Sequence, residues 1–373
     1  MWEQIPKAVL EPTLQSLLLM LGINYWTVFP TNDIRIEGFT LTKEQAQFWD
    51  SLYLNGLGEF FYLMKMDFHD LIKFPFDASL TTPTPVSFPR PARALLLNGA
   101  GKDSILSAEL LKASGTPFDF FSFAPTPAHE RIAKLVGANT RKVTRRRDPR
   151  INFLATVHGV SSAYPSVSTF TFIAVLLAEL FGYDSIVFSN ERSADFGNLT
   201  YRGLPVNHQW CKSSEAEKMV NEYLQRYVTP SIGTSSLLRE YSELEIVRQF
   251  VEHPKYLRYV TSCNNYFWLS PLEQYLSGSG YWCKECPKCV FLFACFAAFL
   301  PKKEVVSMFG GNLYAKKHLL PLIREILGIE GYKPLDCVGE PEEMILAMHY
   351  AAKRNEYAGT PALRLFEERF PQA

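Results

Sequence analysis

Between residues 94 and 189 the chain alternates short, largely apolar runs with longer segments whose apolar residues recur at helical spacing. The apolar runs have the length of buried strands and lie at 94–97, 118–123 and 184–189, with a more polar strand predicted at 141–144. The helical segments lie at 103–112, 128–135 and 168–180. This alternation predicts an α/β fold with a parallel, doubly wound sheet that has helices on both faces.

The residues before this region have a different pattern, which indicates a small α+β unit at 1–75. Its predicted elements are helices at 12–21 and 44–54 and strand-like runs at 25–29 and 34–41. A stretch rich in proline, threonine and serine follows at 77–91 and is the best linker candidate in the sequence. We therefore expect an N-terminal domain at 1–85 and a second domain that begins at residue 92.

From residue 214 onward the pattern is mainly helical. Ser242 and Glu245 have the spacing of a capping box, which marks the start of one helix. Further helices are predicted at 214–227, 287–299, 314–327 and 340–353. We expect the sheet domain to extend over 92–300 and a helical C-terminal region at 301–373 to pack on it.

The composition is that of a globular, soluble protein without a charge bias. Of the 373 residues, 47% are hydrophobic, which supports a sizeable core, and 38 Lys and Arg balance 38 Asp and Glu. Proteins that bind large nucleic acids more often have a basic excess, so no nucleic-acid partner is expected. A local basic run from Arg141 to Arg150 fits either the phosphates of a small molecule or a solvated loop.

No segment is predicted to enter a membrane. The apolar stretch 8–22 contains Glu11 and Pro12 and lacks the basic front and cleavage site of a signal peptide, so we expect a packed helix there. No other segment has 18 uncharged apolar residues in a row. Seven cysteines, three of them within seven residues, suit metal binding in a reducing compartment better than disulfides. We expect a cytoplasmic protein.

The strongest chemical signal is the segment 98–104, where an apolar strand meets a glycine-rich turn and then a helix. The turn at 99–101 lets the backbone approach an anion, and Lys102 adds positive charge. The helix that begins near Asp103 directs unpaired N–H groups at the same place, which favours phosphate binding. It is not a Walker A loop, because Asp103 separates the lysine from the serine. An ordinary strand–turn–helix junction is the alternative.

Two polar segments follow the last predicted strand of the sheet region. Residues 190–198 place six polar side chains directly after the strand at 184–189, at the edge where open α/β sheets bind ligands. A second segment, 206–213, contains His208 and Lys212, which are four residues apart and can share a helical face. Histidine is suited to proton transfer near neutral pH, and a desolvated lysine can also act as a base. A polar surface loop and a structural histidine are the alternatives.

These motifs resemble those of a known superfamily. The order Gly-x-Gly-Lys-Asp-Ser at 99–104 is similar to the loop of the PP-loop ATP pyrophosphatases, which split ATP into AMP and diphosphate while they adenylate a substrate. That loop usually reads Ser-Gly-Gly-x-Asp-Ser, so this chain departs at the first two positions. With the motifs at 189–198, 206–213 and 282–289, the chain most resembles the ATP-dependent UDP-N-acetylmuramoyl-L-alanyl-L-glutamate epimerase family of bacteria.

The resemblance implies a PP-loop fold, ATP and Mg²⁺ as cofactors, and a nucleotide-linked peptide from peptidoglycan precursor synthesis as the small-molecule substrate. In the implied reaction, adenylation removes the charge of the glutamate α-carboxylate, so a base can abstract the Cα proton. A proton then returns to the other face, and hydrolysis frees AMP. Neither the sequence nor the resemblance indicates an oligomeric state.

The resemblance also implies roles for individual residues. Asp103 is expected to hold Mg²⁺ on the phosphates of ATP. The implied ATP-binding residues are Asn98, Gly99, Gly101, Lys102, Asp103, Ser104 and Asn190. The candidates for acid, base and carboxylate-binding groups are Glu191, Arg192, His208 and Lys212.

The cysteines at 283–289 predict a metal site. Cys283, Cys286 and Cys289 follow the pattern C-x₂-C-x₂-C, and Cys263 is the candidate fourth ligand. Four thiolates suit a structural Zn²⁺, and a similar run closes a zinc site in the deazaguanine nitrile synthase branch of the pyrophosphatases. An iron–sulfur cluster is a second interpretation, and buried reduced thiols at the start of an apolar helix are a third.

Two other functions stay open. The first is another adenylating enzyme of the same superfamily, such as an amide or nitrile synthase or a tRNA thiolase. The neutral charge disfavours the tRNA version, and a thiolase needs a cysteine pair near the site, for which only Cys211 is well placed. The second is a regulatory nucleotide-binding protein that kept the fold and lost the chemistry, which the altered loop at 99–100 fits.

Overall fold

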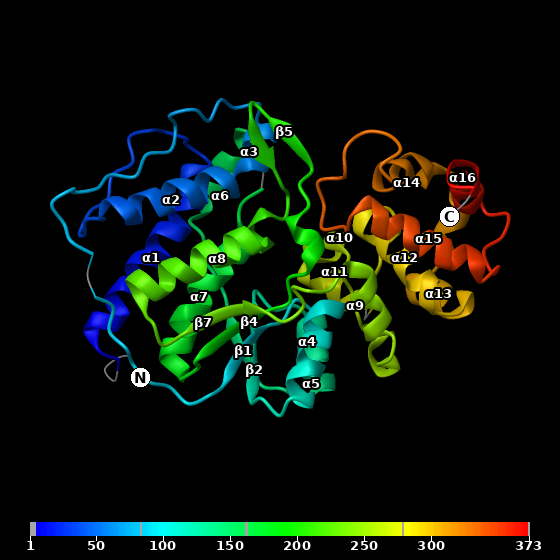
Figure 1. The fold of residues 1–373 in the computed structure, drawn as a ribbon, viewed down its shortest axis with the longest axis horizontal. Coiled ribbons are helices and arrows are strands. Elements are labelled where there is room, and N and C mark those ends of the chain that lie inside the picture. The colour runs from blue at the N-terminus through cyan, green and yellow to red at the C-terminus, as the bar shows by residue number, and fades with distance from the viewer. Residues whose placement is uncertain (1–4, 83, 161–162, 278–279, 372–373) are drawn as a thin grey trace.

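A parallel five-stranded sheet forms the centre of the protein in the computed structural model, which describes residues 5–82, 84–160, 163–277 and 280–371. The strand order is β3-β2-β1-β4-β7, and every neighbouring pair is parallel (Figure 1). The strands are β1 (Ala94–Leu97), β2 (Phe118–Phe123), β3 (Thr140–Val143), β4 (Ser185–Phe188) and β7 (Gly233–Ser236). The predicted parallel sheet is confirmed, with four of these strands at the predicted places.

Alternate residues of β1 enter two different cores, which explains why helices cover both faces of the sheet. Ala94 and Leu96 belong to one core and Leu95 to the other, as the side-chain alternation of a strand requires. The first core includes α4 (Lys102–Ala113), α5 (Pro127–Val136), α9 (Glu243–Phe250) and α12 (Pro287–Phe299). The second includes α7 (Ser166–Phe181) and α8 (Ser214–Tyr223), which a π-helical turn (Leu224–Val228) extends. The fold is therefore doubly wound.

The N-terminal helices pack into the second core. They are α1 (Lys7–Trp26), α2 (Lys43–Gly56) and α3 (Gly58–Leu63). The Tyr53 hydroxyl of α2 donates to the Leu19 carbonyl oxygen of α1 at 2.6 Å, and Trp49 Nε1 donates to the Tyr223 hydroxyl at 3.1 Å. These buried bonds tie the N-terminal helices to each other and to α8.

The two strands predicted in the N-terminal unit are wrong. Residues 25 and 26 end α1, and a turn follows them, while no strand lies at 34–41 among the described residues. Ile34 and Ile36 each pack on the second core. The alternating pattern therefore comes from a loop that packs Ile34 and Ile36 on this core while Arg35 and Glu37 stay exposed, without a neighbouring strand to pair with. The N-terminal unit is helical, and the domain boundaries at 85 and 300 stay predictions.

Several elements had no clear pattern in the sequence. The strand β7 consists of Gly-Thr-Ser-Ser and is defined by its pairing with β4 rather than by apolar residues. The others are the hairpin β5 (Leu199–Tyr201) and β6 (Leu204–Val206), and the helix α6 (Pro149–Val157). Short elements of this kind are formed by tertiary contacts, so propensity alone does not reveal them.

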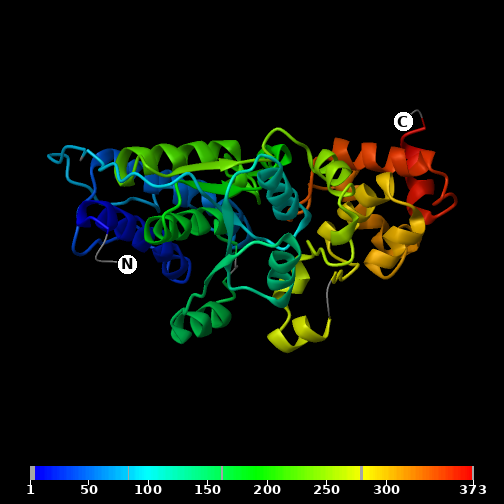
Figure 2. The same cartoon turned by 90° about the horizontal axis from the view of Figure 1, so that it is seen from below.

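The C-terminal part is helical, as predicted, and lies at the end of the molecule opposite α1–α3 (Figures 1 and 2). Its helices besides α9 and α12 are α10 (Asn264–Trp268), α11 (Pro271–Leu276), α13 (Lys302–Phe309), α14 (Leu320–Ile326), α15 (Pro341–Lys353) and α16 (Pro361–Arg369). The capping box at α9 is confirmed, since Ser242 Oγ accepts from the Glu245 N–H at 3.2 Å. The helix predicted at 314–327 is shorter, because Pro321 in the first turn of α14 favours a helix start there.

None of the helices in the described ranges is long and apolar enough to cross a bilayer.

Candidate active site

The glycine-rich turn after β1 is shaped by the side chain of Asn98. Its Oδ1 accepts a hydrogen bond from the Ala100 N–H at 2.9 Å, and its Nδ2 donates to the His129 carbonyl oxygen at 3.2 Å. Ala100 is buried and has a φ of 56°, a left-handed conformation that residues with a Cβ adopt rarely. The bond from Asn98 supports this conformation, so the turn forms with an alanine at its centre.

The backbone of the turn is open at Gly99 and enclosed at Gly101. A Cβ added at Gly99 meets no atom within 4 Å, whereas at Gly101 it comes within 2.9 Å of Ser262 Oγ. Ser104 is buried, and its hydroxyl donates to the Gly101 carbonyl oxygen at 3.1 Å. A ligand can therefore approach the turn over Gly99, while Ser104 stabilises the turn itself.

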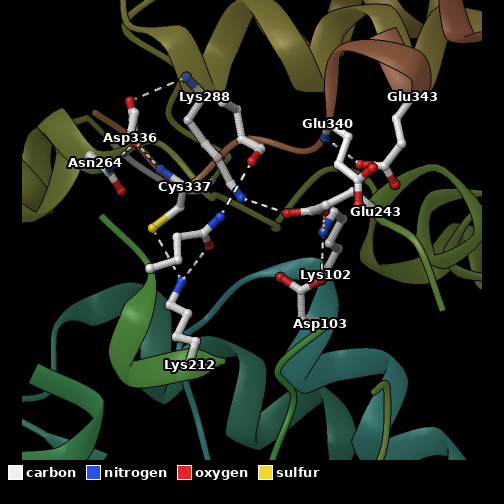
Figure 3. A network of polar contacts seen from close by, with 12 residues as sticks. Lys102, Asp103, Lys212, Glu243, Asn264, Lys288, Asp336, Cys337, Glu340 and Glu343 are labelled. Atoms are coloured by element: carbon white, nitrogen blue, oxygen red, sulfur yellow. Dashed lines mark hydrogen bonds and ion pairs between the residues drawn. The ribbon is translucent and has the colours of Figure 1, made fainter. Parts of the chain in front are cut away.

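A chain of buried charges begins at the first residue of α4. Lys102 Nζ pairs with the carboxylates of Asp103 and Glu243, and Lys288 Nζ lies 2.9 Å from the other oxygen of Glu243 (Figure 3). The side chains of Lys102, Glu243 and Lys288 come from three different helices and are at most 7% exposed. Asp103 is the exception, with 24% of its side chain exposed at the mouth of the turn.

The pKa values of this cluster follow from burial and from the neighbouring charges. Burial opposes the charge of Glu243, but the Lys102 and Lys288 ammonium groups outweigh it and hold the pKa of Glu243 well below its usual range. Glu191 is buried without such an ion pair, and burial, followed by repulsion from Glu243, raises its pKa. Glu243 is therefore the charged carboxylate of the cluster, and Glu191 is the one that can hold a proton.

We expect Glu243→Gln to destabilise the protein by about 3–5 kcal/mol, because it leaves Lys288 buried without its ion-pair partner and Lys102 with Asp103 alone. Urea unfolding of the variant and the native chain measures this difference. Glu240→Gln is the matched control, since Glu240 is exposed three residues earlier in the chain. Equal stability of the two variants would contradict the assignment of Glu243 as the buried counter-ion.

A cysteine that the sequence analysis did not single out lies beside Lys212. Lys212 Nζ is 3.1 Å from Cys337 Sγ and 3.4 Å from the side-chain oxygen of Gln209 (Figure 3). Burial opposes the thiolate form of Cys337, but Lys212 and then His208 outweigh it and lower the pKa of Cys337 to about 7. Cys337 is thus poised between thiol and thiolate at neutral pH.

The loop that carries Cys337, residues 333–339, is fixed in place by side chains from other parts of the chain. Asp336 accepts hydrogen bonds from the Cys337 N–H at 2.7 Å and from the side-chain amide of Asn264. Asn198 Nδ2 donates to the carbonyl oxygens of Lys333 and Pro334 at 3.1 and 2.8 Å. The predicted polar segment 190–198 thereby connects the sheet to this C-terminal loop.

His208 lies in the same cluster. Its backbone N–H donates to Asn198 Oδ1 at 2.8 Å, and its Nδ1 is 2.6 Å from a carboxylate oxygen of Glu59. Burial opposes its charge, but Cys337 and Glu59 outweigh it and raise the pKa of His208 to about 10. At neutral pH His208 is therefore an imidazolium, which suits it to hold a thiolate or a carboxylate more than to act as a neutral base.

The remaining sequence-predicted residues lie in different surroundings. Asn190 is buried and donates to Ser236 Oγ at 3.0 Å. Arg192 follows Glu191 directly but points away from the charge cluster, with 58% of its side chain exposed and Glu245 as its ion-pair partner at 3.9 Å. The structure thus brings Glu191, His208 and Lys212 together and places Arg192 apart from them.

Four residues of the site were missed because each lies far along the chain from the motifs. Glu243 and Lys288 sit in the first turns of helices, and Asp336 and Cys337 sit in a loop near Pro334 and Gly339. The signal that could have found the last two is a polar pair between helix-breaking residues in an otherwise helical region. No local pattern marks Glu243 or Lys288 as partners of Lys102.

The four predicted cysteine ligands form a separate cluster. The sulfur atoms of Cys263, Cys283, Cys286 and Cys289 all lie within 4.8 Å of one another, and the Sγ atoms of Cys283 and Cys289 are 3.7 Å apart. A tetrahedral site with Zn–S bonds of ~2.3 Å places its sulfurs about 3.8 Å apart. The backbone N–H groups of Glu285 and Cys286 donate to Cys283 Sγ at 3.4 and 3.3 Å. This donor set fits zinc.

Two protein-family models match the chain. Residues 2–237 match the MurL N-terminal domain, and residues 259–373 match the MurL C-terminal domain. Among solved structures, that of a predicted subunit of tRNA methyltransferase from Methanocaldococcus jannaschii is 16% identical, covers 50% of this chain and 89% of that one, and has a TM-score of 0.28.

Three curated relatives are similar over nearly the whole chain, and each is named UDP-N-acetyl-alpha-D-muramoyl-L-alanyl-L-glutamate epimerase. The relative from Micromonospora sp. is 33% identical over 98% of this chain and 80% of its own length. The relative from Xanthomonas oryzae pv. oryzae is 33% identical over 95% of this chain and 78% of its own length. That of Salinispora tropica is 32% identical over 98% of this chain and 78% of its own length. With both domain models matched in order, the chain belongs to the MurL family.

Proposed function

We propose that the protein epimerises the terminal L-glutamate of UDP-N-acetylmuramoyl-L-alanyl-L-glutamate, with ATP cleaved to AMP and diphosphate through an acyl-adenylate, in peptidoglycan precursor synthesis. The names of the relatives support the epimerase reaction. The observation that carries the proposal is the juxtaposition of a glycine-rich turn that is open at Gly99 with Cys337, a thiol whose pKa Lys212 lowers to about 7.

The turn after β1 is the proposed ATP end of the site. The open backbone at Gly99 and the start of α4 can accept phosphate oxygens. The Asp103 carboxylate is the partly exposed oxygen donor beside them, which fits Mg²⁺, an ion that is commonly held by one or two carboxylates together with substrate phosphates. Bound there, Mg²⁺ supplies charge stabilisation to the phosphates as the adenylate forms.

Cys337 and Glu191 are the proposed proton-transfer groups. A free α-carboxylate opposes loss of the neighbouring Cα proton, and adenylation removes that charge. The Cys337 thiolate then takes the proton and becomes a thiol, while Glu191, whose pKa burial raises, returns a proton to the opposite face. The two groups regain their first states through Lys212 or solvent. His208 is proposed to hold the carboxyl group that carries AMP.

The cysteine cluster is proposed to hold a structural Zn²⁺. Metal analysis of protein purified without added metal should find about one zinc per chain, and Cys286→Ser should lose it and unfold at lower temperature, because structural zinc supplies folding energy. Cys295→Ala on the same helix as Cys289 is the control and should keep its zinc. Iron in place of zinc, or no metal at all, would contradict this assignment.

Chiral analysis of the product tests the proposed function. The protein is incubated with the UDP-linked dipeptide, ATP and Mg²⁺, and the glutamate is then released by acid hydrolysis. We expect D-glutamate to accumulate with AMP, and neither to form without ATP. Release of AMP without D-glutamate would point to another adenylating reaction instead.

A further inference from the structure

A polar cavity of about 460 Å³ lies beyond the carboxyl end of β3, next to the proposed active site. Its volume is within the range of sites that bind small molecules. Two arginines from the segment after β3, Arg145 and Arg147, line it together with the aromatic rings of Tyr164 and Trp268. The described lining residues include no carboxylate, so the cavity carries net positive charge.

The two arginines of the cavity, like the exposed Arg146 between them, have no acidic partner among the described residues. In the basic run, Arg141 pairs with Asp119, Lys142 with Glu130, and Arg150 with Asp148. Arg145 instead donates to Asn24 Oδ1 at 3.1 Å and lies over the Tyr164 ring at 5.9 Å. Arg147 forms no ion pair or hydrogen bond with the described residues. Unpaired guanidinium groups in a cavity suit phosphate oxygens, which they bind in bidentate fashion.

The cavity lies next to the pocket of His208, the neighbour of Cys337. Tyr164 lines both this cavity and the small pocket that contains His208 and Glu59. The helix α10 also connects them: Asn264 at its start bonds to Asp336, and Trp268 at its end lines the cavity, roughly 6 Å further along the helix axis. The cavity and the neighbourhood of Cys337 are therefore linked through Tyr164 and His208 and through the two ends of α10.

Exposed aromatic and amide groups in the cavity suit a pyrimidine base. Trp268 is 74% exposed although it lines the cavity, so one face of its indole is available for stacking. The side-chain amide of Asn152 has no partner among the described residues and offers both a donor and an acceptor. The helix that carries Asn152, α6, and the segment α10–α11 project on the same side of the molecule (Figure 2).

A larger cavity of about 680 Å³ is less suited to a phosphate-bearing group. Its charged lining residues are four carboxylates and two arginines, namely Glu245, Glu340, Glu342, Glu343, Arg192 and Arg248. The excess of negative charge there repels a diphosphate.

We propose that the cavity formed by Arg145, Arg147, Tyr164 and Trp268 binds the uridine diphosphate end of the substrate, which places the glutamate end at Cys337. The inference rests on the proposed function for the identity of the nucleotide, because the same groups can bind other nucleoside diphosphates. The diphosphate contacts the two guanidinium groups, and the base lies between the aromatic rings and Asn152.

Calorimetric titration of UDP into the full-length protein, without ATP, tests this assignment. We expect UDP to bind the native chain. Arg147→Gln should weaken the affinity for UDP about tenfold or more, because it removes a charge-assisted phosphate contact. Arg146→Gln is the matched control, because Arg146 is an exposed neighbour that does not line the cavity, and it should bind UDP within about twofold of the native chain. Trp268→Ala should weaken UDP binding as well.

Two results would overturn the assignment. One is that UDP does not bind, or binds the native chain and Arg147→Gln equally. The other is that ADP displaces UDP with the same dependence on Arg147, which makes the cavity the ATP site.

In turnover, Arg147→Gln should raise KM for the UDP-linked dipeptide at least tenfold with kcat nearly unchanged. Arg147-dependent UDP binding without any epimerisation would reject the proposed function and leave the UDP site standing.

Discussion

Asp103→Asn should reduce diphosphate release from ATP on the order of a hundredfold or more, while the protein stays folded. The change removes the negative charge of the proposed Mg²⁺ ligand, and metal stabilisation of transferring phosphates contributes several kcal/mol, at 1.36 kcal/mol for each tenfold in rate. Lys102 keeps its ion pair with Glu243, so its buried ammonium group is not left without a carboxylate partner. A coupled diphosphate assay measures the rate, and thermal unfolding checks the fold.

Glu130→Gln is the control for this variant. Glu130 is a carboxylate on α5 near the same end of the sheet, but its side chain is 57% exposed and pairs with Lys142. Its diphosphate release should match that of the native chain. A native rate in Asp103→Asn would place the metal elsewhere.

Cys337→Ala should separate the two halves of the reaction. Acid–base catalysis by one positioned group contributes about 10²–10⁴-fold in rate, so D-glutamate formation should fall by at least about a hundredfold. The adenylating turn is unchanged, and AMP release should therefore continue at a larger fraction of its native rate. Product analysis by chiral chromatography, with AMP measured in the same samples, gives the ratio of the two.

Cys211→Ser is the matched control for Cys337→Ala, because burial raises the pKa of Cys211 and leaves it a thiol at neutral pH. Loss of AMP and D-glutamate in equal measure in Cys337→Ala would show that Cys337 acts before proton transfer, for example as a nucleophile.

Alkylation gives an independent readout of the Cys337 thiolate. Its pKa of about 7 is below the usual thiol value, so iodoacetamide labelling of the Cys337 peptide should rise as the pH increases through 7. In Lys212→Gln the stabilising ammonium is gone, and the midpoint should move to higher pH. The exposed Lys218→Gln should leave it in place. The same labelling midpoint in Lys212→Gln as in the native chain would contradict the pairing of Lys212 with Cys337.

The parts of the fold that sequence predicted are those in which neighbouring residues carry the signal. β1, the turn and α4 are continuous in the chain, so an apolar run, glycines and a helical period were enough to place them. The spacing of Cys283, Cys286 and Cys289 is local in the same way. By contrast, the loop at 34–41 was predicted as a strand because Ile34 and Ile36 pack on the core while the residue between them is polar. A half-buried strand gives the same alternation of apolar and polar residues in the sequence.

The parts that sequence did not predict depend on tertiary packing. Glu243, Lys288 and Cys337 reach Lys102 and Lys212 only after α9, α12 and the loop at 333–339 have docked on the sheet. The periodicity of a sequence indicates which face of an element is buried. It does not indicate which buried charged side chains form ion pairs with one another. Arg192 shows the same limit at short range, since one residue of backbone turns its side chain away from Glu191.

The most direct test of the account is the ATP dependence of solvent exchange at the glutamate Cα. The native protein is incubated in D₂O with Mg²⁺ and the UDP-linked dipeptide, with and without ATP, and deuterium at the glutamate Cα is followed by mass spectrometry. We predict one deuterium in each D-glutamate formed, AMP in at least equal amount, and no exchange without ATP. Exchange at the same rate without ATP would contradict activation of the carboxylate by adenylation.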